Sequence, residues 1–342
     1  MAMPKTVALV ETATQLHNVV EWAHTTGSID DVRVDVLAPT DRQSLRQLFR
    51  VAALARGMGV DVRHRSVRAR NSAAFTGAAA VAHDVRTADR LVLGDPFSRY
   101  IQSLLPLVRA DHLVAVDDGT ATWEFVACLD ANKPMVRWRK PLQGRMALEA
   151  RATKLLTPSV RRRLTVFSCL RDATPLGATR VDNRYSWARA WRTPDIVDDR
   201  VDVLGISLVD SGLIDRRAYV DAVATLVRRH APVRYFAHRR ESDSLVAEID
   251  TLPGVTVVRA DLPAELALRK GPVSRRVITF PSTASHTLPV VLGDLMRDEG
   301  VRIDVRPVDP SWFTPSATSH ARDFVAHIAA VAPRDPRVGV TT

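Results

Sequence analysis

The sequence has few cysteines and no long apolar run. Its 342 residues include only two cysteines, Cys128 and Cys169. This number excludes a disulfide scaffold, and their spacing matches neither a zinc site nor a redox pair. We expect both to be buried apolar residues in a reducing cytoplasm. No apolar run is long enough to span a bilayer, and the run at 7–10 is too short for a signal-peptide core.

The composition is otherwise that of a soluble globular protein. Hydrophobic residues make up 46% of the chain and charged residues 25%, which excludes a mostly disordered protein. The length suits two domains. The formal net charge of +10 favours anionic partners, which include nucleotides, acidic sugars, a membrane surface and nucleic acid. Charge alone does not choose among these partners.

Strand-like and helix-like runs alternate along the chain, which predicts the α/β fold class. The first half has predicted strands at 6–10, 32–37, 60–63, 91–93 and 113–116, and predicted helices at 15–24, 42–56 and 73–85. The second half has predicted strands at 201–208, 233–236, 255–258, 277–280 and 301–305, and predicted helices at 219–229, 244–252 and 287–297. Short apolar strands between helices are typical of a parallel sheet that is covered on both faces.

The two sets of strands predict two Rossmann-like parallel-sheet domains facing a cleft. We assign residues 1–165 to the first domain, 166–200 to a linker, 201–315 to the second domain and 316–342 to a C-terminal helix and tail. Ligands of such sheets bind beyond the carboxyl ends of the strands. The residues that follow each predicted strand are therefore the first candidates for a site.

An acidic turn follows the last predicted strand of the first half. It consists of Asp117, Asp118 and Gly119. Gly119 permits a sharp turn, and Thr120 is placed to cap the next helix. A carboxylate at such a strand end can act as a general base. The alternative is that the two aspartates only cap the turn.

Two strand ends of the second half carry groups that suit a phosphate. His238 follows one strand and can face a phosphate, although it can also be a surface histidine of a basic loop. Ser282, Thr283 and Ser285 follow another strand. Hydroxyl groups and unpaired backbone N–H groups that open a helix form a phosphate cradle. The same residue types also serve as helix caps.

Taken in order, these three motifs resemble those of the bacterial sialyltransferases. That family has an acid-acid-Gly motif, a His-Pro motif and a Ser/Thr motif. Here they correspond to Asp117-Asp118-Gly119, His238-Arg239 and Ser282-Thr283. Arg239 stands where the family has proline, and an arginine can itself bind an anion. The sequence is most similar to the alpha-2,8-polysialyltransferase group and its lipooligosaccharide sialyltransferase relatives.

A fourth likeness follows the first predicted strand. The segment Thr12-Ala13-Thr14-Gln15 resembles the Thr-Pro-x-Gln loop of the polysialyltransferase group, with Ala13 in place of proline. The resemblance adds Thr14, Gln15 and Asn18 to the candidate site.

The resemblance implies a GT-B glycosyltransferase that moves a sialic or related nonulosonic acid from a CMP-activated donor to an acceptor. The transfer would be inverting and would need neither a metal nor a cofactor. Asp117 would take the proton of the acceptor hydroxyl, and His238 would stabilise the phosphate of the leaving CMP. The remaining donor-binding residues would be Asp118, Gly119, Arg239, Ser282, Thr283 and Ser285.

The resemblance also implies a cytoplasmic enzyme that acts on a glycan or lipid-linked acceptor of the cell envelope. Such an enzyme would contact the inner face of an anionic membrane peripherally. The Arg-rich stretch 137–200, with Trp138, Trp187 and Trp191, is the candidate surface. The alternative is a packed linker whose tryptophans belong to a core.

Other classes of protein remain as alternatives. They are a GT-B-like transferase with a different nucleotide-activated donor, and a non-catalytic relative that binds a nucleotide or sugar. A nucleic-acid partner is not expected, because no helix-turn-helix or zinc pattern accompanies the run Arg161-Arg162-Arg163. A dinucleotide dehydrogenase is disfavoured, because no Gly-rich turn follows the first predicted strand.

Overall fold

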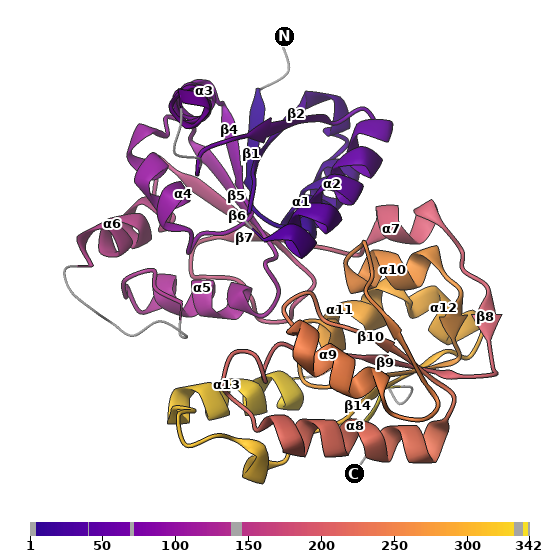
Figure 1. Cartoon of the computed structure of the whole chain (residues 1–342). Helices are drawn as coiled ribbons and strands as arrows, with labels where there is room; N and C mark the ends of the chain where they lie inside the picture. Colours follow the sequence, from indigo (N-terminus) through magenta and orange to yellow (C-terminus); the bar gives the residue numbers. More distant parts are fainter. Residues whose placement is uncertain (1–4, 40, 69–71, 138–145, 332–337, 341–342) are drawn as a thin grey trace. The chain divides into compact units, whose positions relative to one another are not determined.

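The chain forms two compact units, each built around one parallel sheet (Figure 1). The computed structural model describes residues 5–39, 41–68, 72–137, 146–331 and 338–340. The first unit is Met1–Trp187 and the second is Ala188–Thr342. Among the described residues, no helix combines the length and the apolar character that crossing a membrane requires.

The first unit contains a seven-stranded parallel sheet in the order β3-β2-β1-β4-β5-β6-β7. Its strands are β1 (Thr6–Val10), β2 (Val32–Leu37), β3 (Asp61–Arg65), β4 (Arg90–Leu93), β5 (His112–Val116), β6 (Arg163–Ser168) and β7 (Thr179–Asp182). Its helices are α1 (Ala13–Thr26), α2 (Arg42–Gly57), α3 (Ser72–Thr87), α4 (Arg99–Leu104), α5 (Ala121–Asp130) and α6 (Ala147–Leu156), with short 3-10 helices η1 (Ile29–Asp31) and η2 (Leu105–Leu107). At the centre of the sheet, Ala8 of β1 lies opposite Val34 of β2 on one side and Val92 of β4 on the other.

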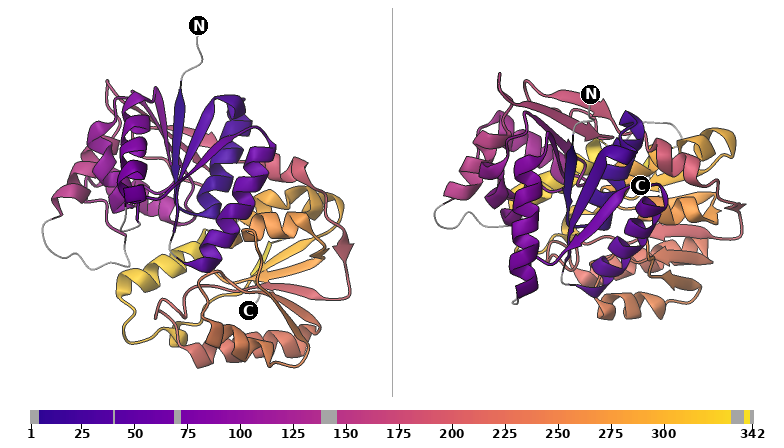
Figure 2. Two further views of the ribbon diagram at one scale, coloured as in Figure 1. Left: turned by 45° about the horizontal axis from the view of Figure 1, so that its top comes forward. Right: turned by 90° about the horizontal axis from the view of Figure 1, so that it is seen from above.

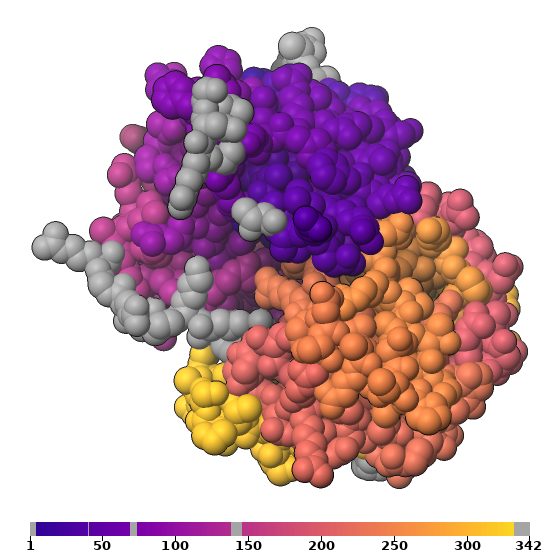
Figure 3. Space-filling view, in the orientation of Figure 1, coloured from indigo at the N-terminus to yellow at the C-terminus, as the bar shows by residue number. Residues whose placement is uncertain are grey.

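Both faces of this sheet are buried by helices. On one face, Val7 and Leu9 of β1 share a core with Val85 of α3 and Phe125 of α5. Successive side chains of a strand point to opposite faces, so Ala8 and its alternates turn toward the other face, where α1 and α2 contact each other. The two helix layers are visible in Figure 2. Figure 3 shows the atoms at the surface of each unit from one side, coloured from indigo at the N-terminus to yellow at the C-terminus.

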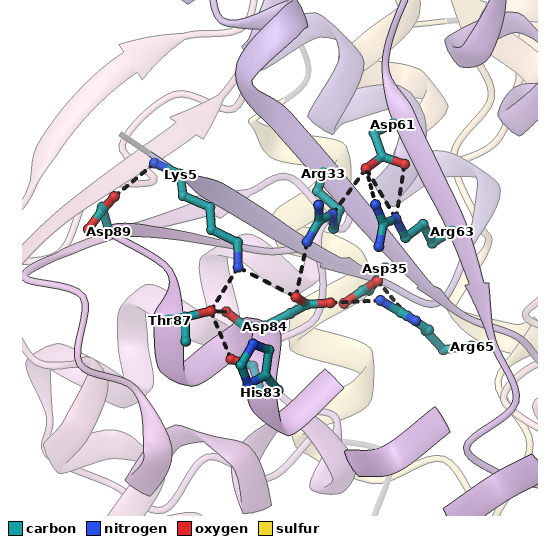
Figure 4. Close-up of polar contacts among 10 residues, drawn as sticks. All are labelled: Lys5, Arg33, Asp35, Asp61, Arg63, Arg65, His83, Asp84, Thr87 and Asp89. Carbon is teal, nitrogen blue, oxygen red and sulfur yellow. Dashed lines mark hydrogen bonds and ion pairs between the residues drawn. The ribbon is translucent and has the colours of Figure 1, made fainter. Parts of the chain in front are cut away.

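A network of charged residues connects α3 to strands β2 and β3 of the first sheet (Figure 4). Asp84 of α3 is 5% exposed. Its carboxylate accepts hydrogen bonds from Arg33 Nη1 at 3.0 Å and Arg65 Nη2 at 2.7 Å, and Lys5 Nζ lies 3.5 Å away. Arg65 Nε also donates to Asp35 at 2.7 Å. Three positive charges therefore share the Asp84 carboxylate, and Arg33 has a second partner in Asp61, to which its Nε donates at 3.0 Å.

The second unit contains a six-stranded parallel sheet in the order β11-β10-β9-β13-β14-β15, and a small two-stranded sheet of β12 and β8. The strands are β8 (Ile196–Val197), β9 (Val201–Leu204), β10 (Val233–Phe236), β11 (Val255–Val258), β12 (Val273–Ser274), β13 (Arg276–Thr279), β14 (Arg302–Val305) and β15 (Val338–Val340). The helices are α8 (Arg216–His230), α9 (Asp243–Asp250), α10 (Ala264–Lys270), α11 (Ala284–Val291), α12 (Gly293–Asp298) and α13 (Ser319–Ala330), with the 3-10 helix η3 (Pro310–Trp312). Helix α7 (Ser186–Trp191) spans the boundary between the units.

The α/β fold class predicted from the sequence is confirmed, with a parallel sheet in each unit. The helix predicted at 287–297 is wrong in one respect, because it is two helices, α11 and α12. Leu292 leaves helical geometry between them, with φ −99° and ψ 11°. Pro289 lies inside α11 and Gly293 begins α12, and both residue types weaken a continuous helix.

The first unit extends beyond the predicted boundary at residue 165. Strands β6 and β7 continue the first sheet through residues that the sequence pattern placed in a linker. Beyond β7, Asn183 Nδ2 donates to Asn18 Oδ1 at 3.1 Å, and the Trp187 N–H donates to Glu21 Oε2 at 2.9 Å. These bonds fasten the segment to α1. At the other end of the chain, His286 Nε2 of α11 donates to the Ile328 carbonyl at 3.0 Å, which fastens α13 to the second unit.

Candidate functional site

The first candidate site lies at the carboxyl edge of the first sheet, beside the point where the strand order reverses. Strand β1 lies next to β4, so the chain proceeds in one direction through β2 and β3 and in the other through β5 and β6. Ligands of doubly wound sheets bind at this switch point. The loops that follow β1, β4 and β5 carry the residues described below.

Gln15 links the loop after β1 to the acidic turn after β5. Its Oε1 accepts the backbone N–H groups of Glu11 at 2.7 Å and Thr12 at 3.2 Å. The Thr12 hydroxyl in turn accepts the Gln15 N–H, which completes a capping box at the start of α1. Because the carbonyl oxygen is used in this way, the amide nitrogen is left to donate to Asp118 Oδ1 at 2.9 Å.

The end of β4 must be a glycine for this contact to form. A Cβ atom at Gly94 would lie 2.9 Å from Gln15 Cβ and 3.0 Å from the Leu9 carbonyl oxygen. Real Cβ atoms essentially never show a contact as short as the first, and the second is tighter than nearly all of their contacts. Gly94 therefore allows the first turn of α1 to approach the sheet. Thr14 lies half-buried in the same turn and, among the contacts of the described residues, takes no part in this network.

Asn18 fixes the backbone of the acidic turn. Its Nδ2 donates to the Asp117 carbonyl at 2.8 Å, while its Oδ1 accepts from Asn183. The Asn183 oxygen in turn accepts the Tyr185 N–H at 3.0 Å. Gln15 and Asn18 thus bring the N-terminal loop and the acidic turn together, and Asn183 joins them.

Asp117 is almost completely buried, with 1% of its surface exposed. The Thr122 hydroxyl donates to Oδ1 at 3.0 Å, and the Cys169 N–H donates to Oδ2 at 2.8 Å. Burial raises the pKa of Asp117 to about 6, against the hydrogen bonds from Ser168, Cys169 and Thr122, which lower it. Its partners among these donors are all neutral, so an ionised Asp117 is solvated by dipoles alone.

Asp118 is paired with a cation. Arg137 Nη2 lies 2.5 Å from Asp118 Oδ2 and 2.8 Å from Asp95 Oδ2. The side chain of Asp118 is 16% exposed and that of Asp95 10%. The pKa of Asp95 is raised to about 6, first by burial and then by the charge of Asp118, while Arg137 opposes the shift. The loops after β4 and β5 therefore carry three carboxyl groups. Asp95 and Asp118 share the Arg137 guanidinium, whereas Asp117 is bonded to neutral donors.

Asp95 and Arg137 are site residues that the sequence patterns did not reveal. Asp95 follows β4, so the rule that selected Asp117 applies to it equally. Arg137 was assigned only to a surface, because nothing local in the sequence connects it to Asp95. Glu11 also belongs to this edge, since it accepts hydrogen bonds from Arg68 Nη2 and Ser98 Oγ, each at 2.7 Å.

The acidic turn itself has the predicted geometry. Gly119 has φ +67°, which only glycine adopts without strain. Thr120 is the N-cap residue of α5, as expected, but its side chain makes no capping hydrogen bond. Of the two cysteines, Cys128 is buried as predicted, whereas Cys169 is half-buried.

The second candidate site lies at the carboxyl edge of the second sheet. Strand β9 lies between β10 and β13, so the turn that carries His238 and the turn that carries Ser282 flank the end of β9. His238 and Arg239 are half-buried. The Arg240 N–H donates to His238 Nδ1 at 3.1 Å. A neutral imidazole with this bond carries its proton on Nε2, which makes that nitrogen a donor.

The Ser/Thr turn opens α11. Ser282 and Thr283 are half-buried, and Thr283 is the N-cap residue, although its side chain makes no capping hydrogen bond. Ser285 is completely buried, and its hydroxyl donates to the Ser282 carbonyl at 2.7 Å. Ser285 therefore stabilises the turn instead of presenting a surface that a donor could touch.

Glu241 is a third residue at this edge, and no sequence motif marks it. It is 4% exposed, and its Oε2 accepts the His238 N–H at 2.8 Å. Its Oε1 accepts the Tyr235 hydroxyl at 2.6 Å. Burial raises the pKa of Glu241 to about 7, although the hydrogen bonds from Tyr235, His238 and Ile206 oppose this.

A pocket of about 270 Å³ opens at the other edge of the first sheet. Thr6, Arg90 and His112, from the amino-terminal ends of three strands, contribute to its lining. Because ligands in this class of sheet bind at the carboxyl edge, the loops after β1, β4 and β5 are the candidate site and this pocket is not.

The Arg-rich stretch divides between core and surface. Trp187 is buried, which favours the alternative that it belongs to a packed core. Trp191 is half-buried. Trp138 lies outside the described residues. Arg162 donates to the carbonyls of Leu155 and Val108, so it is part of the fold. Arg161 and Arg163 are exposed.

No protein-family model and no curated protein sequence matches the chain. Its fold is similar to those of solved structures that include the following two. HepE from Anabaena, solved with UDP and glucose, is 11% identical with a TM-score of 0.51, and the match covers 96% of this chain and 92% of that one. The 2,6-sialyltransferase of Photobacterium sp. JT-ISH-224, solved with CMP and lactose, is 10% identical with a TM-score of 0.50, and the match covers 98% of this chain and 78% of that one.

These two likenesses establish the fold. The chain has the GT-B architecture, in which each of two units has a Rossmann-like parallel sheet. At 10% and 11% identity, the likenesses do not carry a donor or an acceptor over to this chain, because one fold serves many activities.

Proposed function

We propose that this protein is an inverting glycosyltransferase that moves a sialic or related nonulosonic acid from a CMP-activated donor to a glycan or lipid-linked acceptor. The observation that carries the proposal is the hydrogen-bond network of Gln15 and Asn18 with Asp117 and Asp118. Two motifs that resemble the sialyltransferases at distant points of the sequence share one switch point. The Photobacterium enzyme of the same fold, solved with CMP, supports the choice of nucleotide.

In the proposed reaction, the acceptor oxygen forms a bond to the anomeric carbon of the donor sugar. The bond from that carbon to the phosphate oxygen of CMP breaks, and its electron pair leaves with CMP. The proton of the acceptor hydroxyl passes to Asp117. The sugar passes through a state that resembles an oxocarbenium ion, so the negative charge develops on the phosphate.

The second unit supplies groups that stabilise this charge. His238 Nε2–H is a donor because Nδ1 already accepts the Arg240 N–H. The Ser282 and Thr283 turn contributes hydroxyl groups and the N-terminus of α11, where the helix dipole favours an anion. Donors that are fixed in advance stabilise a developing charge strongly. The proposed transfer therefore requires neither a metal nor a cofactor.

Asp117 is the proposed base for an electrostatic reason. A pKa of about 6 leaves it ionised at neutral pH and close to the range in which a general base is efficient. Asp118 is instead bound to Arg137 and Gln15. Since Asp117 is 1% exposed, the proposal requires the turn at 117–120 to open when the acceptor binds.

A different nucleotide-activated donor is the second candidate. Arg239 stands in place of the proline of the sialyltransferase motif, and HepE has the same fold and was solved with UDP and glucose. A non-catalytic relative that binds a nucleotide or sugar is the third, since Asp117 is buried. Both candidates keep the second unit as the nucleotide site.

Nucleotide binding separates these candidates. Titration calorimetry with CMP, UDP, GDP and ADP should give the tightest binding for CMP. His238→Ala and Ser282→Ala should each weaken CMP binding by about tenfold, the effect of losing one hydrogen bond to a charged group. His320→Ala, an exposed histidine of α13, is the matched control. Binding of UDP or GDP without CMP would contradict the sialyltransferase assignment and leave the GT-B transferase in place.

A further inference from the structure

A buried carboxylate lies directly beneath the His238 turn. Glu241 Oε1 accepts the Tyr235 hydroxyl of β10 at 2.6 Å, and the Tyr219 hydroxyl of α8 lies 3.5 Å away. The two tyrosine hydroxyls are 2.7 Å apart. Oε2 accepts the His238 N–H at 2.8 Å. One carboxylate thus connects a strand, a helix and the turn that carries the candidate phosphate ligand.

The end of β9 is shaped to admit this carboxylate. A Cβ atom at Gly205 would lie 2.6 Å from both carboxylate oxygens of Glu241 and 2.5 Å from the Tyr235 hydroxyl. Gly205 does not have a positive φ, so its backbone conformation is open to any residue. The requirement for glycine at this position is therefore one of space, and Glu241 and Tyr235 occupy that space.

The carboxylate determines the conformation of the turn. The Glu241 N–H donates to the His238 carbonyl at 2.9 Å, while the Glu241 side chain accepts the His238 N–H. Both backbone polar groups of His238 are therefore bonded to Glu241. The ring is fixed in addition by the Arg240 N–H on Nδ1. A turn constrained in this way presents Nε2–H in one direction.

We propose that Glu241 is the positioning residue of His238, and that it fixes the turn so that Nε2–H meets the donor phosphate. The proposal rests on the proposed function of His238 and adds to it a residue that does not touch the donor. Preorganised ligands need such a supporting shell, because a site that is misplaced by about 1 Å loses much of its effect.

Protonation of Glu241 should loosen the turn. The ionised carboxylate accepts hydrogen bonds from Tyr235, His238 and Ile206, but the protonated group must donate one hydrogen and loses an acceptor site. The groups that face it are Tyr219 and Tyr235, His238 on its own turn, and Asp210, whose charge raises the pKa further. With a pKa of about 7, the change falls within the neutral range.

Two variants and two controls test the proposal. Gly205→Ala forces the carboxylate aside, and Glu241→Gln replaces it with a group that cannot ionise. Gly293→Ala is the control for the first, because the nearest atom to its Cβ is 3.7 Å away. Glu248→Ala is the control for the second, because Glu248 of α9 forms an exposed ion pair with Arg216 of α8. Circular dichroism establishes that each variant is folded.

The first readout is the affinity for CMP between pH 6 and pH 8. Gly205→Ala should weaken binding by about tenfold at pH 8, whereas both controls should stay within about twofold. The ratio of wild-type affinity to Glu241→Gln affinity should rise from about one at pH 6 to about ten at pH 8, and ionisation of CMP itself cancels in this ratio. Unchanged affinity in both variants, or a ratio independent of pH, would overturn the proposal.

The second readout does not depend on any nucleotide. Nitrogen NMR of the histidine rings, with the His238 signal assigned from His238→Ala, reports which ring nitrogen carries the proton. The wild type should show the Nε2–H form, and Gly205→Ala should show a mixture of both forms. If the wild type binds no CMP but Gly205→Ala shows the mixture of tautomers, the proposed function fails and the positioning role stands. If Gly205→Ala shows the same His238 tautomer as the wild type, the positioning role fails.

Discussion

Gln15 Nε2 donates a hydrogen bond of 2.9 Å to Asp118 Oδ1 across 103 positions of the sequence. The same side chain accepts two backbone N–H groups at the start of α1. One glutamine therefore satisfies the helix terminus and orients the acidic turn. Together with the bond from Asn18 Nδ2 to the Asp117 carbonyl, this contact joins the loop after β1 to the loop after β5.

Replacement of Gln15 should destabilise the first unit. Gln15→Ala leaves the N–H groups of Glu11 and Thr12 without their side-chain acceptor and removes a donor from Asp118. We expect a loss of about 1–3 kcal/mol in the free energy of unfolding, measured by urea denaturation. Thr14→Ala, in the same turn of α1 but outside the network, should change the stability by about 0.5 kcal/mol or less. Equal losses in both variants would contradict the role of Gln15.

The burial of Asp117 should appear in the pH dependence of stability. Its pKa is raised from 3.8 to about 6 in the folded state, so the native state binds the proton more tightly than the unfolded state. The resulting stabilisation is present below pH 3.8 and is lost as the pH rises through about 6. Asp117→Asn does not titrate.

Between pH 4 and pH 7.5, the stability of Asp117→Asn relative to the wild type should therefore increase by about 2.4 kcal/mol, since one pKa unit corresponds to about 1.4 kcal/mol and part of the shift lies below pH 4. Other titrating groups cancel in this difference. Denaturant unfolding of both proteins across this range measures it. Parallel stability curves for the two proteins would show that Asp117 is not protonated with a raised pKa.

The α/β class and most strand positions follow from the sequence, because short apolar runs are local signals. Asp117, Asp118 and His238 are candidates because each follows a predicted strand. Strand β7 was missed because Thr179–Asp182 is a short, largely polar edge strand with no fully buried residue, which lacks the apolar pattern of a central strand.

The partners of the site residues could not be predicted in the same way. Arg137 meets Asp95 and Asp118 only after the chain has folded, and no spacing in the sequence relates these residues. Glu241 belongs to the His238 segment, but its side chain is accommodated by the space at Gly205, which follows another strand, β9. Ser285 has the residue type of a phosphate ligand, yet burial against the Ser282 carbonyl gives it a structural role.

The charged network around Asp84 should contribute strongly to stability. Asp84→Asn leaves Arg33, Arg65 and Lys5 without their shared carboxylate (Figure 4). Removal of one partner of a buried ion pair costs about 3–5 kcal/mol, and we expect about 3 kcal/mol because Lys5 and Arg33 are partly exposed. Asp111→Asn, which breaks an exposed pair with Arg163, should cost less than about 1 kcal/mol. Urea denaturation compares them, and similar midpoints for both variants would contradict this expectation.

The proposed peripheral contact with a membrane depends on exposed arginines. Arg161→Ser combined with Arg163→Ser should weaken binding to vesicles that contain phosphatidylserine by roughly tenfold or more, since each basic residue near an anionic surface contributes about 1 kcal/mol. The effect should vanish at high salt. Arg302→Ser, an exposed arginine of the second unit, is the control. Binding that ignores salt, or that the control weakens equally, would remove this surface from the proposal.

The most direct test of the proposed transfer is the release of CMP from CMP-N-acetylneuraminic acid, measured with and without a glycan acceptor. The wild type should release CMP faster when the acceptor is present. Asp117→Asn should reduce that rate by about 10²–10⁴, the usual effect of losing a general base, and Asp118→Asn should reduce it less. A reversed order of the two variants would assign the base to Asp118. Absence of CMP release by a folded wild-type protein that also fails to bind CMP would contradict the proposed function.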